Sequence, residues 1–159
     1  MTPTLTVSAD TGKTPFAWPV RVYWEDTDAG GIVYYANYLK FFERARTEWL
    51  RAKGIHQQAL LEETGGMFVV SEAQVRYLKS ARLDDELLLT TSLTEAGRAS
   101  LTIRHCLMIN NLGSLPSWSI RSTISIYIRI TTASTGRRWL RNTAQKLKGD
   151  WKPRPFIPK

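Results

Sequence analysis

The chain has 159 residues, a length that suits a single domain with one hydrophobic core. One cysteine excludes an internal disulfide, and no apolar run approaches the roughly 20 residues that span a bilayer, so a disulfide-stapled or transmembrane protein is not expected. The formal charge of +8 would suit a nucleic-acid binder, but the distribution of the charges argues against one.

The charges divide the chain into parts. Residues 1–136 hold 14 basic and 13 acidic residues, whereas residues 137–159 hold eight basic residues and one acidic residue. Residues 1–14 are mostly small and polar and contain no signal-peptide core, which predicts a disordered arm on a cytoplasmic protein. We therefore expect a disordered arm at 1–14, one folded domain at 15–136 and a basic tail at 137–159.

A strand and a long helix open the predicted domain. Residues 18–26 alternate apolar and polar side chains, with Trp24 on the apolar side, which is the period of a half-buried strand. From 37 to 53 apolar residues recur every three or four positions, which predicts the principal helix. Asn37 is a candidate cap for its first turn, and Gly54 suits a left-handed cap at its end.

Further strands are expected after this helix. A short helix at 55–64 precedes β-type sequence in MFVVSEAQVRYL, and three more strands are predicted at 85–94, 100–109 and 119–131. One long helix with about five antiparallel strands predicts an α+β domain in which a curved sheet wraps the helix. Because uncapped sheet edges tend to pair, we expect a homodimer in which two sheets join.

Two carboxylates stand where the first strand meets the principal helix. Asp26 and Asp28 precede Gly30 and Gly31 in the stretch DTDAGG. Taken alone, such a stretch is more typical of a turn or a helix cap than of a catalytic site. The residues around it change that interpretation, because they match a known pattern.

The pattern lies in residues 21–42, RVYWEDTDAGGIVYYANYLKFF, and its matching residues are Arg21, Val22, Thr27, Asp28, Gly31, Ile32, Val33, Tyr38 and Phe41. This segment resembles the signature of the hotdog-fold acyl-CoA thioesterases of the 4-hydroxybenzoyl-CoA thioesterase group. It is most similar to the small bacterial thioesterases associated with the Tol-Pal envelope system. The similarity continues through FFERARTEWLRAKGI and VRYLKSARLDDEL. The chain departs from the Tol-Pal-associated pattern at Tyr35, where those proteins usually carry His, and it matches only loosely after residue 110.

The resemblance implies a hotdog fold and the hydrolysis of an acyl-CoA, or of an acyl carrier protein thioester, to the free acid and the thiol. Asp28 would act as nucleophile or general base, and the backbone amide of Tyr35 would stabilise the oxyanion. Gly30 and Gly31 would let the backbone approach the substrate closely. Contacts to the CoA moiety would come from Lys79, Ser80, Arg82 and Arg98.

Other functions stay open at this stage. The same fold could bind acyl-CoA without cleaving it or serve as an envelope-associated interaction protein, and the basic tail could bind an anionic surface. With His56, His105 and Cys106 far apart in sequence, no metal site is expected, and no cofactor is expected because CoA is part of the substrate. The residues leave open the acyl group, the role of Asp28 as nucleophile or base, and the choice between homodimer and homotetramer.

Overall fold

A computed structural model describes residues 15–96, 100–109 and 124–131, together with Leu147. The elements follow one another as β1 (Phe16–Arg21), the 3-10 turn η1 (Trp24–Asp26), α1 (Asn37–Ala52), α2 (Gln57–Thr64), β2 (Met67–Val75), β3 (Glu86–Ala96), β4 (Ser100–Ile109) and β5 (Ile124–Thr131). The predictions for the arm at 1–14 and the tail at 137–159 lie outside the described residues, except that Leu147 is buried in the core.

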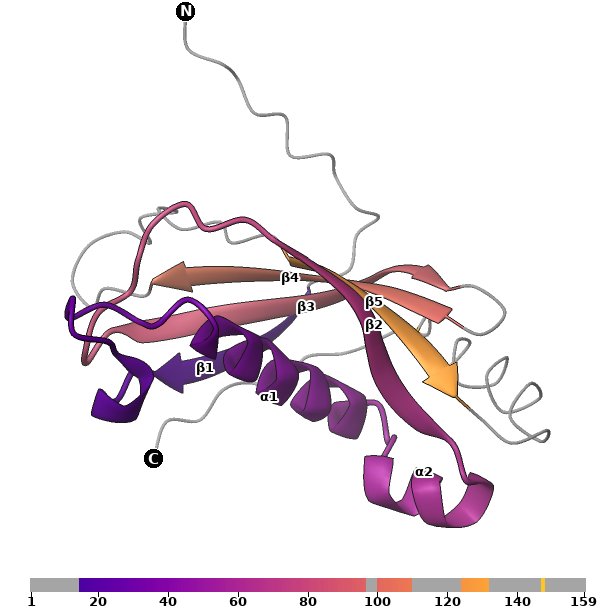
Figure 1. Ribbon diagram of the computed structural model, residues 1–159. Helices are drawn as coiled ribbons and strands as arrows, with labels where there is room; N and C mark the ends of the chain where they lie inside the picture. The colour runs from indigo at the N-terminus through magenta and orange to yellow at the C-terminus, as the bar shows by residue number, and fades with distance from the viewer. Residues whose placement is uncertain (1–14, 97–99, 110–123, 132–146, 148–159) are drawn as a thin grey trace, which may run out of the picture.

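The five strands form one antiparallel sheet in the order β1-β3-β4-β5-β2. Figure 1 shows α1 lying across one face of this curved sheet, with α2 beyond the end of α1. The α+β architecture and the five-strand sheet are therefore confirmed. In this order β1 and β2 are the outer strands, so each has one side without a partner strand in the described part of the chain.

The core lies between α1 and the sheet. The periodicity of the helix is responsible, because apolar residues three and four positions apart fall on one face. That face buries Tyr38, Phe41, Phe42, Ala45, Trp49 and Leu50. The sheet supplies Leu87, Leu89, Leu101, Ile103 and Leu107, which alternate along β3 and β4. Each such side chain contributes about 1.5–3 kcal/mol by leaving water, so this layer holds α1 and the segment before it in place.

The prediction of a strand over residues 18–26 is wrong in its second half. β1 ends at Arg21, and Trp24–Asp26 form a 3-10 turn in which the Trp24 side chain is 78% exposed, not turned inward as the alternation suggested. The carboxylate of Asp26 causes the change. Its Oδ2 accepts the backbone N–H of Tyr23 at 2.9 Å, and the turn closes where Thr27 N–H donates to the Trp24 carbonyl. Local hydrogen bonds from an aspartate compete with strand pairing in this way.

The principal helix begins and ends close to the predicted residues, but its first turn is not capped by Asn37. The Asn37 side chain makes no cap bond, and its Nδ2 donates to the carbonyl of Glu25 at 3.2 Å, which ties α1 to the 3-10 turn. The other end follows the prediction. Gly54 has a φ of 74°, and Ile55 N–H donates back to the Leu50 carbonyl.

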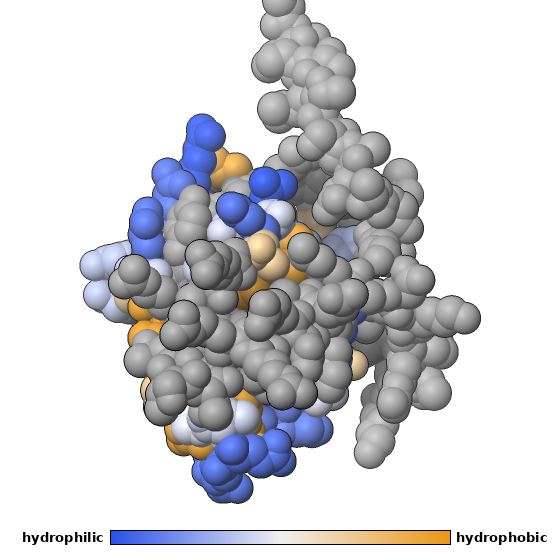
Figure 2. Space-filling view, turned by 90° about the vertical axis from the view of Figure 1, so that its right-hand side faces the viewer, coloured by the Kyte–Doolittle hydropathy of each residue, from blue (hydrophilic) through white to orange (hydrophobic). Residues whose placement is uncertain are grey.

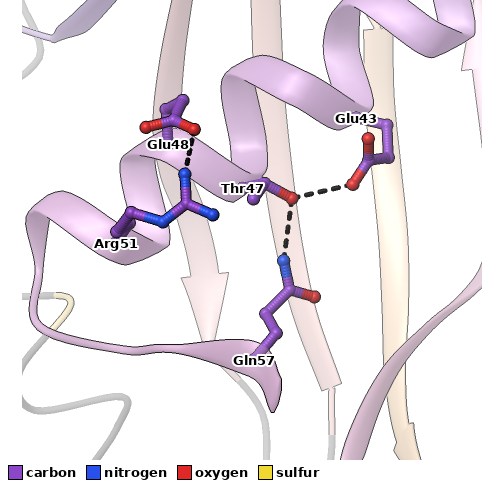
Figure 3. Close-up of polar contacts among 5 residues, drawn as sticks. All are labelled: Glu43, Thr47, Glu48, Arg51 and Gln57. Carbon is purple, nitrogen blue, oxygen red and sulfur yellow. Dashed lines mark hydrogen bonds and ion pairs between the residues drawn. The ribbon is translucent and has the colours of Figure 1, made fainter. Parts of the chain in front are cut away.

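A polar network connects the end of α1 to α2 (Figure 3). The Thr47 hydroxyl donates to Glu43 at 2.7 Å and accepts from the Gln57 side chain at 2.8 Å, while Glu48 and Arg51 form an ion pair one turn further on. The network lies at the C-terminal end of α1. Neither helix is long and apolar enough to cross a membrane among the residues that the structure describes.

Some apolar surface stays open to solvent. In Figure 2 hydrophobic and hydrophilic surface lie next to each other on one face of the molecule. On the outer strand β2, Met67, Val69 and Val70 are exposed. Soluble proteins seldom leave neighbouring large apolar side chains open without a use for them.

Candidate active site

A tight hairpin carries the two carboxylates that the sequence singled out. Thr27 and Val33 pair across it, Asp28 N–H donates to the Ile32 carbonyl at 3.0 Å, and Gly31 N–H donates to the Asp28 carbonyl at 2.9 Å. Gly31 has a φ of 69°, a conformation that a residue with a Cβ adopts only at a cost. The hairpin therefore depends on this glycine, and it presents Asp28 at its tip.

The Asp28 side chain is exposed, and only one of its oxygens is used within the described structure. Gly30 N–H donates to Oδ1 at 2.8 Å, which fixes the carboxylate against the loop, while Oδ2 accepts no hydrogen bond from any described residue. A Cβ at position 30 would lie 3.1 Å from Oδ1, so glycine leaves room for this contact. The result is a held carboxylate with one oxygen open to a ligand.

Asp26 has a different environment from Asp28. It is buried, and its Oδ2 is taken by the Tyr23 backbone in the 3-10 turn. Its own carbonyl accepts Tyr34 N–H at 2.9 Å across the hairpin. From the sequence, both carboxylates could have been turn-forming groups without a catalytic role. Asp26 has that structural role, whereas only one oxygen of Asp28 is used by the turn.

The amide predicted to hold the oxyanion belongs to Tyr35, two residues before α1 begins. The amides of Tyr34 and Asn37 are used, since they donate to the carbonyls of Asp26 and Tyr34 respectively. Tyr35 N–H donates to no backbone carbonyl among the described residues. A free amide beside the positive end of a helix is a suitable donor for negative charge.

Four tyrosines form a cluster between this amide and β2, and sequence reasoning gave a role to only one of them. The ring centroids lie 4.7 Å apart for Tyr34 and Tyr35, 6.3 Å for Tyr35 and Tyr77, and 5.6 Å for Tyr38 and Tyr77. Two of the hydroxyls bind backbone: Tyr77 donates to the Tyr35 carbonyl at 2.9 Å, and Tyr38 accepts Ala81 N–H at 2.9 Å. We call these four residues the tyrosine cluster.

Local contacts raise the pKa of three phenols in the cluster, those of Tyr34, Tyr38 and Tyr77. The hydrogen bond with Tyr35 raises the pKa of Tyr34, and the nearby Asp28 charge raises it further. Burial raises the pKa of Tyr38 and of Tyr77. The Tyr77 hydroxyl already donates to the Tyr35 carbonyl, and the Tyr38 hydroxyl is buried against Ala81 N–H.

The predicted CoA contacts lie along one exposed segment. Lys79 and Ser80 follow β2 and are open to solvent, and Arg82 forms an isolated bridge with Ile32 of the hairpin. The backbone N–H of Arg82 donates to the Asp85 carboxylate at 2.8 Å, and its side chain is exposed. Arg98 lies outside the described residues. The structure thus brings Arg82 beside the Asp28 hairpin, and the roles of all four residues stay predictions.

No group of three His, Cys, Asp or Glu side chains capable of holding a metal occurs in the part of the chain that the structure describes. The groups available at the hairpin are the exposed Asp28 carboxylate and the Tyr35 amide, which has no backbone acceptor among the described residues. This set can activate water or attack a carbonyl carbon, and it can stabilise an oxyanion.

Comparison with known proteins points to the same chemistry. Residues 30–113 match the sequence profile of the Thioesterase superfamily. The chain is 52% identical over 97 residues to an acyl-CoA thioesterase, YbgC, of Haemophilus influenzae, which covers 61% of this chain and 71% of that protein. It is 54% identical over 88 residues to an acyl-CoA thioester hydrolase, YbgC, of Escherichia coli O157:H7, which covers 55% of this chain and 65% of that protein.

A solved structure is similar as well. The crystal structure of a probable thioesterase from Bartonella henselae superposes with a TM-score of 0.66 at 29% sequence identity. The superposition covers 75% of this chain and 93% of that one. The arrangement of helix and sheet described above is thus shared with this protein over nearly its whole length.

Proposed function

The chain belongs to the thioesterase superfamily and has its hotdog fold, and from this we propose that it hydrolyses the thioester bond of an acyl-CoA with Asp28 as the catalytic carboxylate. The observation that carries the proposal is the state of Asp28. One oxygen is fixed by Gly30 while the other is open, at the tip of a hairpin that leads into the N-terminus of α1. Relatives with half of their residues identical over the matched segment carry names for this activity.

The proposed reaction takes one of two routes from this carboxylate. In the first, Oδ2 attacks the thioester carbonyl carbon, the C–S bond breaks to release the thiol, and water then hydrolyses the resulting anhydride. In the second, Asp28 takes a proton from water while the water oxygen attacks the same carbon, and the C–S bond then breaks as the proton passes from Asp28 to the leaving thiolate. Either route yields a carboxylic acid and CoA thiol, and CoA enters as part of the substrate, so the proposal calls for no cofactor.

Negative charge develops on the carbonyl oxygen in both routes. We assign its stabilisation to the amide of Tyr35, which has no backbone acceptor among the described residues and lies next to the positive end of α1. Removal of one such donor in a hydrolase typically slows turnover on the order of 100- to 1,000-fold. Gly30 and Gly31 would let the substrate come close to the hairpin backbone.

The nucleotide end of CoA carries phosphates, for which exposed basic side chains are suitable partners. Lys79, Ser80 and Arg82 lie on the segment that bridges to the hairpin, and we propose that they bind this end together with Arg98. An acyl carrier protein is the alternative carrier of the thiol. A cytoplasmic location and an association with the Tol-Pal system stay predictions from the sequence.

The test of the proposed function is thiol release from acetyl-, butyryl-, palmitoyl- and hydroxybenzoyl-CoA. The native protein should release thiol from at least one of them, and Asp28→Asn should lose on the order of a hundredfold or more, because the variant has neither base nor nucleophile. Asp84→Asn is the matched control, since Asp84 is exposed and has a φ of 65°, which asparagine tolerates.

The outcomes of this assay distinguish a catalytic Asp28 from the alternatives. Native activity that survives in Asp28→Asn would refute the carboxylate assignment and leave the fold untouched. No thiol release by the native protein from any of the four substrates would instead favour the non-catalytic alternative, in which the hotdog domain only binds acyl-CoA. Binding of unhydrolysed acyl-CoA by the inactive variant would show that Asp28 acts in the chemistry and not in binding.

A further inference from the structure

The peptide groups on either side of Tyr35 are held in different ways. Before α1 begins, the Tyr34 carbonyl accepts Asn37 N–H at 2.8 Å and the Ala36 carbonyl accepts Leu39 N–H at 3.1 Å, as in an ordinary helical first turn. The Tyr35 carbonyl between them is bound instead by a side chain from far along the sequence, the hydroxyl of Tyr77 at 2.9 Å.

The segment that supplies Tyr77 meets the loop before α1 at two depths. At the deep contact, the buried Ala81 gives its N–H to the Tyr38 hydroxyl and accepts Val33 N–H at its carbonyl, both at 2.9 Å. At the shallow contact, Tyr77 is 42% exposed and its ring meets that of Tyr35 edge-on, at an interplanar angle of 82°. The deep contact anchors the segment, and the shallow one places the Tyr77 ring against Tyr35 and Tyr38 and its hydroxyl on the Tyr35 carbonyl.

The shallow contact acts on the residue that matters for catalysis. The N–H and the carbonyl of Tyr35 belong to peptide planes joined at one Cα, so only two rotations separate them. Holding the carbonyl side therefore restricts where the N–H can point. An oxyanion donor must lie about 2.7–3.1 Å from the developing charge. The Tyr34 carbonyl, in the same peptide plane as the Tyr35 N–H, is held by Asn37, and Tyr77 holds the next plane, so the two bonds together fix the direction of this N–H.

We propose that Tyr77 is a positioning residue for the thioesterase reaction, whose hydroxyl holds the peptide after Tyr35 so that the Tyr35 amide faces the thioester carbonyl. This inference rests on the proposed function. It goes beyond that function by assigning Tyr77 a role exerted only through the backbone carbonyl that it binds. A structural role alone would show as lost stability, whereas a positioning role shows in turnover.

The experiment replaces Tyr77 by Phe, which keeps the ring against Tyr35 and Tyr38 and removes only the hydroxyl. We expect kcat to fall about tenfold while KM changes by less than about twofold, because the lost contact matters when charge develops on the substrate and not when the substrate binds. Tyr77→Leu, which also removes the ring contacts, should lose at least as much. Leu78→Ala is the control, since Leu78 is the exposed neighbour in the same segment and no recorded hydrogen bond joins it to Tyr35 in the described structure.

Two further readouts separate positioning from unfolding. The amide of Ala36 shares its peptide group with the Tyr35 carbonyl, so its ¹⁵N resonance should shift in Tyr77→Phe and stay in place in Leu78→Ala. Thermal unfolding of Tyr77→Phe should match the native protein within a few degrees, because the lost bond is partly exposed.

Several results would overturn the proposal. A native kcat in Tyr77→Phe would do so, as would an unshifted Ala36 resonance or a loss of activity that only follows the unfolded fraction. If the native protein releases no thiol at all, the proposed function fails and this inference fails with it. If Asp28→Asn is inactive while Tyr77→Phe keeps full turnover, the proposed function stands and only the role of Tyr77 is lost.

Discussion

His105 lies in the core, and burial of its imidazole should lower the free energy of unfolding at acidic pH. Its side chain on β4 is fully buried, with Nδ1 3.0 Å from the Thr91 hydroxyl and the ring 5.3 Å from that of Phe42. Its Nε2 and the Nη1 of the buried Arg46 have no hydrogen-bond partner in the described structure. Burial lowers the pKa of His105 to about 3, with the positive charge of Arg46 as the second cause, so the imidazole is neutral in the folded protein.

This pKa predicts how stability depends on pH. An unfolded His titrates near 6.5, so above that pH neither state binds the proton and the full stability is present. As the pH falls from about 6.5 towards 3, the unfolded chain takes up a proton that the folded chain refuses, and the free energy of unfolding drops by up to about 1.4 kcal/mol per pH unit. Between pH 7 and pH 5 this group alone should cost about 2 kcal/mol.

Urea denaturation of the native protein and of His105→Gln at these two pH values checks the prediction. Carboxylates titrate in both proteins, so the difference between the two slopes isolates His105. Glutamine can still bond to the Thr91 hydroxyl and has no titration of its own. Equal losses in both proteins from pH 7 to pH 5 would mean that His105 is not the neutral, buried group described here.

At the level of elements, helices were easier to predict than the segment around the candidate site. α1 was placed within one residue because its apolar periodicity runs for 16 residues and Gly54 ends it with a left-handed residue. The strand predicted at 18–26 stopped early because Asp26 forms local hydrogen bonds that periodicity cannot reveal. Patterns report which face of an element is buried, and they do not report side chains that bond to nearby backbone.

The candidate site also combines residues that the sequence could indicate with a contact that only the folded structure reveals. Asp28 was singled out through a family resemblance, since its residue type beside two glycines suits an ordinary turn equally well. Tyr77 was missed because its partner lies 42 positions away and the pairing exists only after folding. The one signal in the sequence was a large aromatic residue beside the basic side chains predicted to bind CoA.

The link between α1 and the segment after β2 leads to a prediction of its own. The buried Ala81 donates its N–H to the Tyr38 hydroxyl, which is the acceptor recorded for this N–H within the described structure. Tyr38→Phe removes the acceptor and leaves a buried donor unpaired, which should lower the free energy of unfolding by about 1–3 kcal/mol.

Chemical denaturation measures this change, with Tyr23→Phe as the control. Tyr23 is an exposed tyrosine on the approach to the 3-10 turn, so loss of its hydroxyl should alter stability by less than about 0.5 kcal/mol. A Tyr38→Phe variant as stable as the control would indicate that water or a shifted backbone satisfies Ala81. The deep contact assumed in the argument for Tyr77 would then need revision.

At the level of the whole molecule, the outer strand β2 leaves apolar side chains open in the part of the chain that the structure describes. β5 pairs with one side of it, and its other side has no partner strand among the described residues. Val70 is 45% exposed, Met67 and Val69 are similarly open, and the strand carries Glu72 as its one charged residue. Long outer strands that lack lysine or proline pair readily with a second copy.

We therefore propose that two chains associate through β2, so that their sheets join across a twofold axis. Light scattering coupled to size exclusion should give a mass of two or four chains for the native protein, which also decides between dimer and tetramer. Val70→Lys places a charge on the outer strand and should weaken association at least tenfold in concentration, because a lysine ammonium is costly to desolvate in a joint between sheets. Leu61→Lys is the matched control, since Leu61 is an exposed leucine on α2, outside the sheet.

The two variants together separate the ways in which this proposal could fail. A stable interface generally buries about 1,200–2,000 Å² in total, so one lysine in a joint of that size should shift the midpoint of dissociation visibly on dilution. If Val70→Lys keeps the native mass while Leu61→Lys dissociates, the chains join through the α2 side instead. If the native protein already runs as a single chain at micromolar concentration, the exposed apolar side chains of β2 must serve another contact, and the acyl chain of the substrate is then the first ligand to test against them.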